Sequence, residues 1–267
     1  MPDQRNSASE ESGRRAYLEF EFDLPQALLA NLVDALEGME AAELCERAVA
    51  DIPDEQGVYQ LFLNGALVYV GKTDGDAGLS SRLRRHAIKM LQRHNLEPSM
   101  VSFKAVRVFV FTAMDLEGDL IRHYGGVREL AWNGSGFGSN DPGKERDTSK
   151  VKPDHFDAQF PINIDLTTEF RVKPGASAAE ILSDLKSMLP YTLRFQSADG
   201  SSRKPHRDLE TTELAEFQGQ VSVREMLRMV VSQLPTGWHV TALPGYIIMY
   251  KNDKRSFPSG TILATST

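Results

Sequence analysis

Apolar residues recur at helical spacing in the first third of the chain. In residues 25–49 this pattern predicts two short helices, with apolar positions at Leu28, Leu29, Leu32, Val33 and Leu36. A second pattern of this kind predicts a helix over residues 81–94 that opens on Ser80 or Ser81 as its N-cap. The apolar stripe of that helix must face a core, and it consists of Leu83, Ala87, Met90 and Leu91.

Short apolar and alternating segments predict strands on either side of that helix. Two of them, Val58–Leu63 and Ala66–Val70, flank Asn64-Gly65, which is the strongest short signal for a β-hairpin. A third strand is expected over Val101–Phe111. A helix then follows a capping box at Thr112–Asp115 and ends at Gly125-Gly126, before a Gly-rich and Ser-rich loop.

Beyond residue 160, two segments resemble each other at an offset of 45 residues. Each opens on a Ser-x-x-Glu capping box, at Ser177 and at Ser222, and each helix stops at a proline. Strand-like runs precede and follow each helix, which predicts a duplicated β-α-β unit. We therefore expect a C-terminal α+β domain over residues 160–267.

Composition bounds the class of protein. The 267 residues contain a single cysteine, Cys45, so we expect neither an intramolecular disulfide nor a cysteine-based zinc site. No apolar run approaches the length of a membrane span, and the polar residues 1–16 are predicted to be a disordered tail. These features predict a soluble, cytoplasmic protein with no membrane partner.

The net charge of −7 argues against a nucleic-acid partner until its distribution is considered. Residues 1–56 contain fourteen acidic and four basic residues, whereas residues 79–107 contain one acidic and seven basic residues. Because salt screens charges beyond about 10 Å, a local basic field can hold phosphates in an acidic protein. The seven basic residues are Arg82, Arg84, Arg85, Lys89, Arg93, Lys104 and Arg107.

Four polar residues share one stripe of the helix at 81–94, beside its apolar face. They are Arg82, His86, Lys89 and Arg93, which helical geometry places within about 60° of one another. Arginine can bind a phosphate oxygen and histidine can move a proton near neutral pH, so this set suits phosphodiester cleavage. Arg84 and Arg85 are expected to matter far less. The alternative interpretation is a basic helix with solvated charges.

A carboxylate in the next predicted helix is a candidate metal ligand. Glu117 lies in the first turn, where the helix dipole favours the ionised form. One carboxylate, completed by waters and phosphate oxygens, suits the hard octahedral preference of Mg²⁺. Asp115 and Asp119 flank it, and the alternative for Glu117 is an ordinary first-turn glutamate.

Taken together, these residues resemble the GIY-YIG nuclease superfamily. The five matching motifs occur in the family's order: Gly57-Val58-Tyr59, Tyr69-Val70-Gly71 followed by Lys72, Arg82-x-x-x-His86, Glu117-x-x-Leu120-Ile121-x-x-Tyr124, and Trp132-Asn133. The resemblance implies a three-stranded antiparallel sheet flanked by helices, within a nuclease domain over residues 17–159.

The restriction endonucleases of that superfamily are the most similar branch. Trp132-Asn133 is followed by Gly136-Phe137-Gly138 and Pro142-Gly143, and a helical segment precedes the first strand, as in those enzymes. The sequence departs from them in a longer link between Glu117 and Asn133. Residues 160–267 resemble no part of them.

The resemblance implies an endonuclease that hydrolyses double-stranded DNA with one Mg²⁺ or Mn²⁺ ion. Glu117 would hold the ion, and Tyr59, assisted by His86, would activate or orient the attacking water. Arg82 would neutralise charge in the transition state, while Tyr69 and Asn133 would position these groups. The expected DNA-binding residues are Lys72, Lys89, Arg93, Lys144 and Arg146.

Two other classes of function stay open. One is a non-catalytic DNA-binding or assembly protein on the same scaffold, and the other is a repair or mobile-element nuclease. The complete set of expected polar residues favours the enzyme, and no DNA-binding motif typical of mobile-element nucleases follows the domain. A homodimer is expected if the DNA target is a palindrome.

The nuclease interpretation also makes a demand on the hairpin. A two-residue turn at Asn64-Gly65 sends Tyr59 and Tyr69 to opposite faces of the sheet. A three-residue turn, with Gly65 in a bulge position, places the tyrosines directly across from each other. Because both must line one active site, we predict the three-residue turn.

Overall fold

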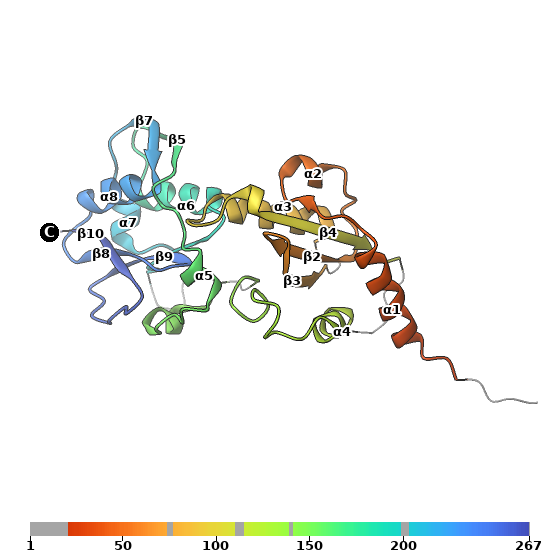
Figure 1. Cartoon of the computed structure of the whole chain (residues 1–267). Helices are drawn as coiled ribbons and strands as arrows, with labels where there is room; N and C mark the ends of the chain where they lie inside the picture. Colours follow the sequence, from red (N-terminus) through yellow and green to blue (C-terminus); the bar gives the residue numbers. More distant parts are fainter. Residues whose placement is uncertain (1–20, 74–76, 110–114, 139–140, 199–202, 267) are drawn as a thin grey trace, which may run out of the picture.

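The computed structural model describes residues 21–73, 77–109, 115–138, 141–198 and 203–266 (Figure 1). Over these ranges the chain is an α+β protein with three small sheets, ordered β1-β4-β2-β3, β10-β8-β9-β6 and β5-β7. The predicted α+β class is thereby confirmed. The tail predicted at residues 1–16 and the predicted capping residue Thr112 lie outside the described residues.

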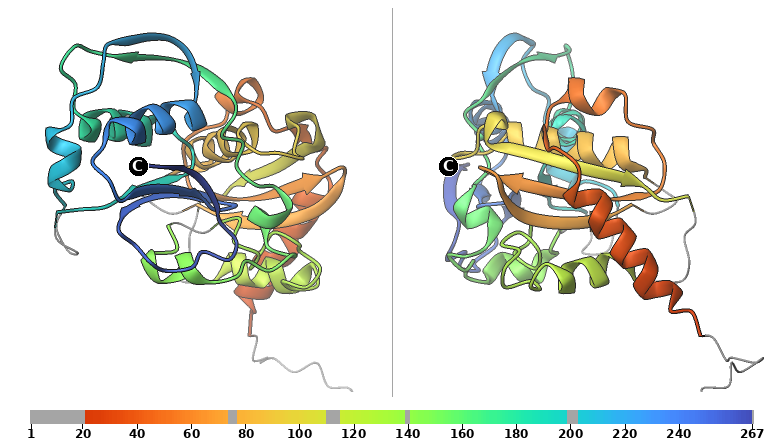
Figure 2. Two further views of the ribbon diagram at one scale, coloured as in Figure 1. Left: turned by 90° about the vertical axis from the view of Figure 1, so that its left-hand side faces the viewer. Right: turned by 45° about the vertical axis from the view of Figure 1, so that its right-hand side comes forward.

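The first sheet is antiparallel and forms the centre of the N-terminal half. Its strands are β1 (Ala42–Glu43), β2 (Gly57–Leu63), β3 (Ala66–Lys72) and β4 (Val101–Arg107). One face packs against α3 (Leu79–Leu91), and the other packs against α1 (Leu24–Glu37) and α4 (Leu116–His123), as Figure 2 shows. Its three long strands match the expected sheet, and the two-residue β1 adds a fourth.

Helix α3 begins two residues earlier than expected. Gly78 occupies its N-cap position and has no side chain to cap it, so the predicted serine caps are wrong. Asp54, which lies between α2 (Glu46–Ala50) and β2, supplies the acceptor: Ser81 donates to it through its backbone N at 2.9 Å and its Oγ at 2.6 Å. These bonds satisfy a free N–H at the helix start and hold the pKa of the Asp54 carboxyl below its usual value.

The turn between β2 and β3 differs from the prediction. Asn64 and Gly65 have φ angles of 50° and 83°, and Leu63 pairs with Ala66. Positive φ at both central residues is typical of the tight two-residue hairpin turn. The predicted three-residue turn is therefore wrong, because the local preference of Asn-Gly prevails.

A bulge nevertheless brings the two tyrosines to one face. The register shifts after Leu61, so Val68 is an extra residue in β3 and Tyr69 pairs with Leu61. Side chains alternate along a strand, so Leu61 and Tyr59 share a face, and Tyr69 joins them there. The predicted common face is confirmed, although the irregularity lies within the strand and not in the turn.

The two capping boxes predicted in the C-terminal half are both present. They open α6 (Ala178–Met188) and α8 (Val223–Gln233). The backbone N–H groups of Ser177 and Ser222 donate to Glu180 and Glu225 at 2.8 and 3.0 Å. Each helix therefore begins at the residue that its local sequence specifies.

The predicted order of strand, helix and strand also occurs twice. Strands β5 (Thr167–Val172) and β6 (Thr192–Phe195) enclose α6, while β7 (Phe217–Ser222) and β8 (Trp238–Ala242) enclose α8. β5 pairs with β7. β6 and β8 both pair with β9 (Tyr246–Lys251), and β10 (Thr261–Thr265) pairs with the other edge of β8. Both helices bury their apolar faces in a single core.

Residues 156–163 join the C-terminal half to the end of α3. This segment contains α5 (Phe156–Gln159) and pairs with the residues that follow α3, through His94 N to Pro161 O at 2.8 Å. Arg93 is buried there, and its Nη1 donates to Asp157 Oδ1 at 2.6 Å and to Phe160 O at 2.9 Å. The segment is therefore held to the N-terminal half by backbone and side-chain hydrogen bonds.

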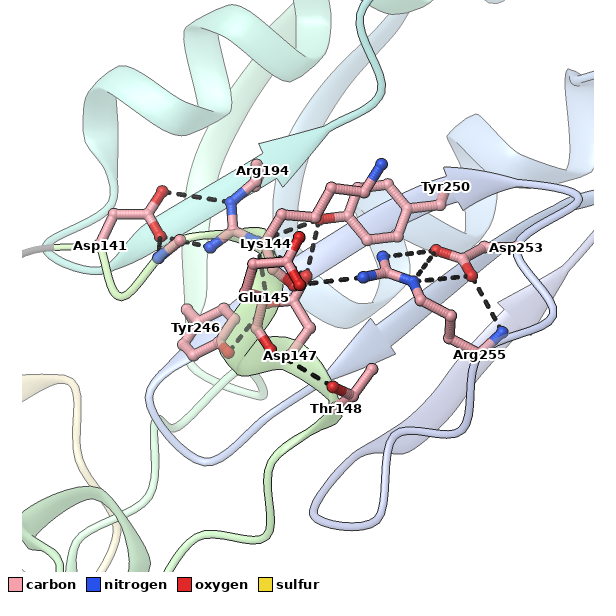
Figure 3. Close-up of polar contacts among 11 residues, drawn as sticks. Asp141, Lys144, Glu145, Asp147, Thr148, Arg194, Tyr246, Tyr250, Asp253 and Arg255 are labelled. Atoms are coloured by element: carbon pink, nitrogen blue, oxygen red, sulfur yellow. Dashed lines mark hydrogen bonds and ion pairs between the residues drawn. The ribbon is translucent and has the colours of Figure 1, made fainter. Parts of the chain in front are cut away.

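A second junction centres on the fully buried carboxylate of Asp147, in the 3-10 helix η2 (Lys144–Thr148). Arg194 of β6 donates to it at 2.8 Å, and the hydroxyls of Tyr246 and Tyr250 donate at 3.0 and 2.8 Å (Figure 3). A buried carboxylate needs several hydrogen-bond donors to replace water, and here β6 and β9 supply them. These bonds hold η2 against the sheet β10-β8-β9-β6.

We expect Asp147→Ala to lower the free energy of unfolding by about 3 kcal/mol, measured by urea denaturation. The substitution removes one carboxylate partner of Arg194 and leaves the two tyrosine hydroxyls without their acceptor. The control is Asp154→Ala on the exposed part of the same segment, which should change stability by less than about 0.5 kcal/mol. Equal effects of both substitutions would contradict the structural role of Asp147.

Candidate active site

A cavity of about 210 Å³ lies between α3, the β2–β3 hairpin and α4. Five of the six residues predicted for catalysis or metal binding line it, although they come from four elements separated in sequence. The lining residues are Tyr59, Tyr69, Lys72, Arg82, Arg85, His86, Lys89, Glu117, Phe137 and Gly138. The fold thus gathers groups that the sequence could only relate by their order.

Gly71 allows the two tyrosine rings to approach each other. It pairs with Tyr59 across the hairpin, and a Cβ at this position would lie 2.6 Å from Tyr59 Cζ and 2.8 Å from Tyr69 Cε1. The ring centroids of Tyr59 and Tyr69 are 6.0 Å apart. Gly71 is therefore required by ring packing, because any side chain would displace the rings from the cavity wall.

Tyr59 and His86 form a buried hydrogen-bonded pair. The Tyr59 hydroxyl and His86 Nε2 are 2.8 Å apart, and the imidazole stacks on Phe137 with centroids 4.8 Å apart. Burial lowers the pKa of His86 to about 3, aided by the neighbouring cations, and burial raises the pKa of Tyr59 above its usual value. Both groups are therefore neutral near pH 7, and the imidazole can accept a hydrogen bond from the phenolic O–H.

Four cationic side chains surround this pair. Arg82, Arg85 and Lys89 come from α3, and Lys72 comes from the end of β3. Lys89 Nζ donates to the carbonyl of Phe137, and burial lowers the pKa of Lys89 to about 8. With one carboxylate among the lining residues, the cavity is strongly electropositive and suits an anionic ligand.

Glu117 is that carboxylate. It lies in the first turn of α4, whose N-cap Asp115 accepts a hydrogen bond from Gly118 N at 3.2 Å. Burial raises the pKa of Glu117, whereas Lys72 and Arg82 oppose that rise. A single half-buried carboxylate facing a polar cavity fits Mg²⁺, which usually binds one or two carboxylates together with waters and phosphate oxygens.

Asn133 acts from behind the cavity wall. Its Oδ1 accepts from Val70 N and its Nδ2 donates to Val70 O, both at 2.9 Å. Trp132 N also donates to Val68 O at 2.8 Å. These bonds hold the outer edge of β3 beside Tyr69, so Asn133 is a positioning residue and does not line the cavity.

The structure corrects one predicted DNA contact and separates two others from the cavity. Helix α3 ends at Leu91, before Arg93. The Arg93 guanidinium is buried in an ion pair with Asp157, so it is not available to bind phosphates. Lys144 and Arg146 are exposed, but they lie in η2 and not at the cavity. Lys72 and Lys89 line the cavity.

Sequence reasoning also missed Arg85 and Phe137. Arg85 was expected to matter far less than Arg82, yet both residues line the cavity. Its position three residues after Arg82 is a helical neighbour, so the spacing alone could have included it. Phe137 gave no signal beyond its glycine-rich motif, since its contact with His86 depends on the path of the chain after α4.

Comparison with protein-family models and with curated proteins found no match to this chain. Across the described ranges, no three His, Cys, Asp or Glu side chains come together in a group that could hold a metal ion. None of the helices in those ranges is long and apolar enough to cross a membrane. The candidate site therefore has to be interpreted from its own geometry.

The depressed pKa of His86 predicts a specific loss of stability in acid. Between pH 6.5 and about 3 the unfolded chain binds a proton at this residue and the folded chain does not. His86 should therefore lower the free energy of unfolding by roughly 2 kcal/mol between pH 7 and pH 5. Urea denaturation at both pH values should show a smaller difference for His86→Gln than for the unsubstituted protein. An imidazole that protonates near pH 6 by NMR would contradict this prediction.

Proposed function

We propose that this protein is a metal-dependent endonuclease that hydrolyses phosphodiester bonds in double-stranded DNA. The observation that carries the proposal is the cavity itself, in which Tyr59, Tyr69, Arg82, His86 and Glu117 meet from separate elements. These are the residues that carry the resemblance to the GIY-YIG nucleases. The alternative interpretation of α3, a basic helix with solvated charges, does not account for the buried hydrogen-bonded pair of Tyr59 and His86.

The pair of Tyr59 and His86 is suited to orient and deprotonate a water molecule. The neutral imidazole accepts a hydrogen bond from the phenolic O–H, and the hydroxyl oxygen of Tyr59 can accept one from water. As the water attacks, its proton would pass to the Tyr59 oxygen while the phenolic proton passes to His86 Nε2. An anionic phosphate in the cavity favours the imidazolium form and so raises the pKa of His86 from its low value in the empty cavity. Binding of the substrate thereby makes the imidazole a stronger base.

The cations would stabilise the charge that develops on the phosphate. Arg82 presents a planar guanidinium suited to two phosphate oxygens, and Arg85 and Lys89 add donors on the same helix. Tyr69, held through β3 by Asn133, fixes the opposite wall. A divalent ion held by Glu117 would supply Lewis-acid stabilisation of the phosphate oxygens.

The restriction type of endonuclease is the form that we favour. The Gly136-Phe137-Gly138 motif carries the resemblance to that branch, and its Phe137 packs on His86 within the cavity. A palindromic target would call for a homodimer. A non-catalytic DNA-binding protein on the same scaffold is the alternative. It gives no role to the Tyr59–His86 pair, and it predicts DNA binding without cleavage.

We expect Glu117→Gln to abolish Mg²⁺-dependent cleavage of plasmid DNA while DNA binding survives. The amide keeps the size of the side chain but loses the charge that holds a hard cation. Cleavage is followed on agarose gels, and binding is followed by fluorescence anisotropy. Asp119→Asn, in the same turn of α4 but paired with Arg122, is the control and should stay active. Full cleavage by Glu117→Gln, or by the unsubstituted protein in excess chelator, would contradict the metal assignment.

Two arginines of α3 provide a matched comparison. Arg82→Ala should reduce the single-turnover cleavage rate about 100-fold or more, because it removes a donor from the reacting phosphate. Arg84→Ala should change the rate less than about twofold, because Arg84 is exposed and lies 4.0 Å from Glu46, away from the cavity. Equal and mild effects would show that α3 acts only as a basic surface.

A further inference from the structure

The segment Asp141–Lys152 and the loop between β9 and β10 form one surface. Arg255 Nη1 donates to Lys144 O at 3.2 Å, and Val151 N donates to Ser259 Oγ at 2.8 Å. The Lys144 ammonium also lies 4.9 Å from the ring centroid of Tyr250. Residues more than a hundred positions apart are therefore fixed side by side, as the close-up in Figure 3 shows for Lys144 and Arg255.

Carboxylates within this region are largely occupied by internal partners. Asp147 is buried on Arg194 and two tyrosines, and Arg194 Nε also donates to Asp141 at 3.2 Å. Asp253 binds the Arg255 guanidinium at 2.9 Å, which holds the pKa of that carboxyl below its usual value. These acids therefore contribute little negative field to the outer face.

Cations, by contrast, project from it. Five exposed cationic residues define what we call the clasp surface: Lys144, Arg146, Lys150, Lys152 and Lys254. Two exposed acids that lie among them, Glu145 and Asp154, form no ion pair within the described residues. A surface with more unpaired cations than acids, in a protein whose net charge is −7, is a local basic field suited to phosphates.

The clasp surface lies within reach of the same duplex as the cavity. Gly138 lines the cavity, and Lys144 lies six positions further along the chain, so the chain limits the distance between their Cα atoms to about 22 Å. One turn of B-DNA is about 34 Å long. Figures 1 and 2 show α4, which carries Glu117, and the segment after Asp141 along the same lower side of the molecule in all three views.

We propose that the clasp surface binds the phosphate backbone of duplex DNA about half a helical turn from the scissile phosphate, so that the C-terminal half is part of the DNA-binding surface. The proposal rests on the endonuclease function for its substrate. It goes beyond that function by assigning a role to Lys254, Lys150 and Lys152. Contacts of this kind position the duplex and carry no sequence information directly.

The test compares charge-neutralised variants in the Glu117→Gln protein, which does not cut. Affinity for a 30-base-pair duplex of mixed sequence is measured by fluorescence anisotropy at several salt concentrations, in chelator. Lys152→Gln with Lys254→Gln should weaken binding roughly 10-fold and should reduce the slope of log affinity against log salt by about 2. Circular dichroism verifies that each variant is folded.

The matched control neutralises two exposed cations, Arg171 in β5 and Lys173 directly after it. The ribbon of β5 and β7 lies at the top of Figure 1, away from α4. Arg171→Gln with Lys173→Gln should leave both the affinity and the salt slope unchanged. Equal losses in both pairs, or a loss confined to the control pair, would overturn the proposal. Unchanged binding by the Lys152 and Lys254 pair would also overturn it, as would binding to an acidic protein or to anionic vesicles in preference to DNA.

This experiment separates the inference from the proposed function. If the unsubstituted protein cuts DNA and the Lys152 and Lys254 substitutions leave the salt slope unchanged, the clasp surface fails while the endonuclease stands. If the protein never cuts DNA but those substitutions reduce the salt slope, the surface binds DNA and the chain is a non-catalytic DNA-binding protein.

Discussion

The geometry of the cavity depends on how the outer edge of β3 is hydrogen-bonded and on the register of that strand. An edge strand presents unpaired backbone groups, and here Trp132 and Asn133 occupy them by bonding to Val68 and Val70. The extra residue Val68 shifts the register of β3 by one. Because a one-residue shift moves every side chain to the other face, this bulge determines that Tyr69 shares the cavity with Tyr59.

Burial then gives the cavity its chemistry. It raises the pKa of Tyr59 and Glu117 and lowers the pKa of His86 and Lys89, so each of these groups is pushed toward its neutral form. The surrounding arginines keep their charge. The cavity thus combines weakened acids and bases with fixed positive charge. An anion that binds there favours the protonated forms of His86 and Lys89 and opposes ionisation of Tyr59 and Glu117. Binding of an anion is therefore coupled to protonation of the two bases, His86 and Lys89.

Local signals in the sequence predicted most of the elements, and long-range contacts account for the differences. The capping boxes at Ser177 and Ser222 were found because donor and acceptor lie three residues apart. The cap of α3 was missed because its acceptor, Asp54, lies 27 residues away. Arg93 shares the periodicity of Arg82, but helix α3 ends at Leu91, and the returning chain buries its guanidinium. Periodicity predicts which face a residue takes, and only tertiary contacts decide what covers that face.

The C-terminal half is tied to the site through the segment that follows the cavity wall. Phe137 is held by Lys89 at its carbonyl, and the chain on its N-terminal side is held by Phe156 N, which donates to Ser135 O at 2.8 Å. Farther along, Arg194 binds both Asp141 and Asp147 and so fixes the segment against β6. A module joined only by a flexible linker would leave Phe137 free to move away from His86. Bonds therefore hold the chain on both sides: Ser135 and Phe137 are held at the cavity by Phe156 and Lys89, and Asp141 and Asp147 are held at the C-terminal sheet by Arg194, so the C-terminal half supports the chain on either side of the cavity wall.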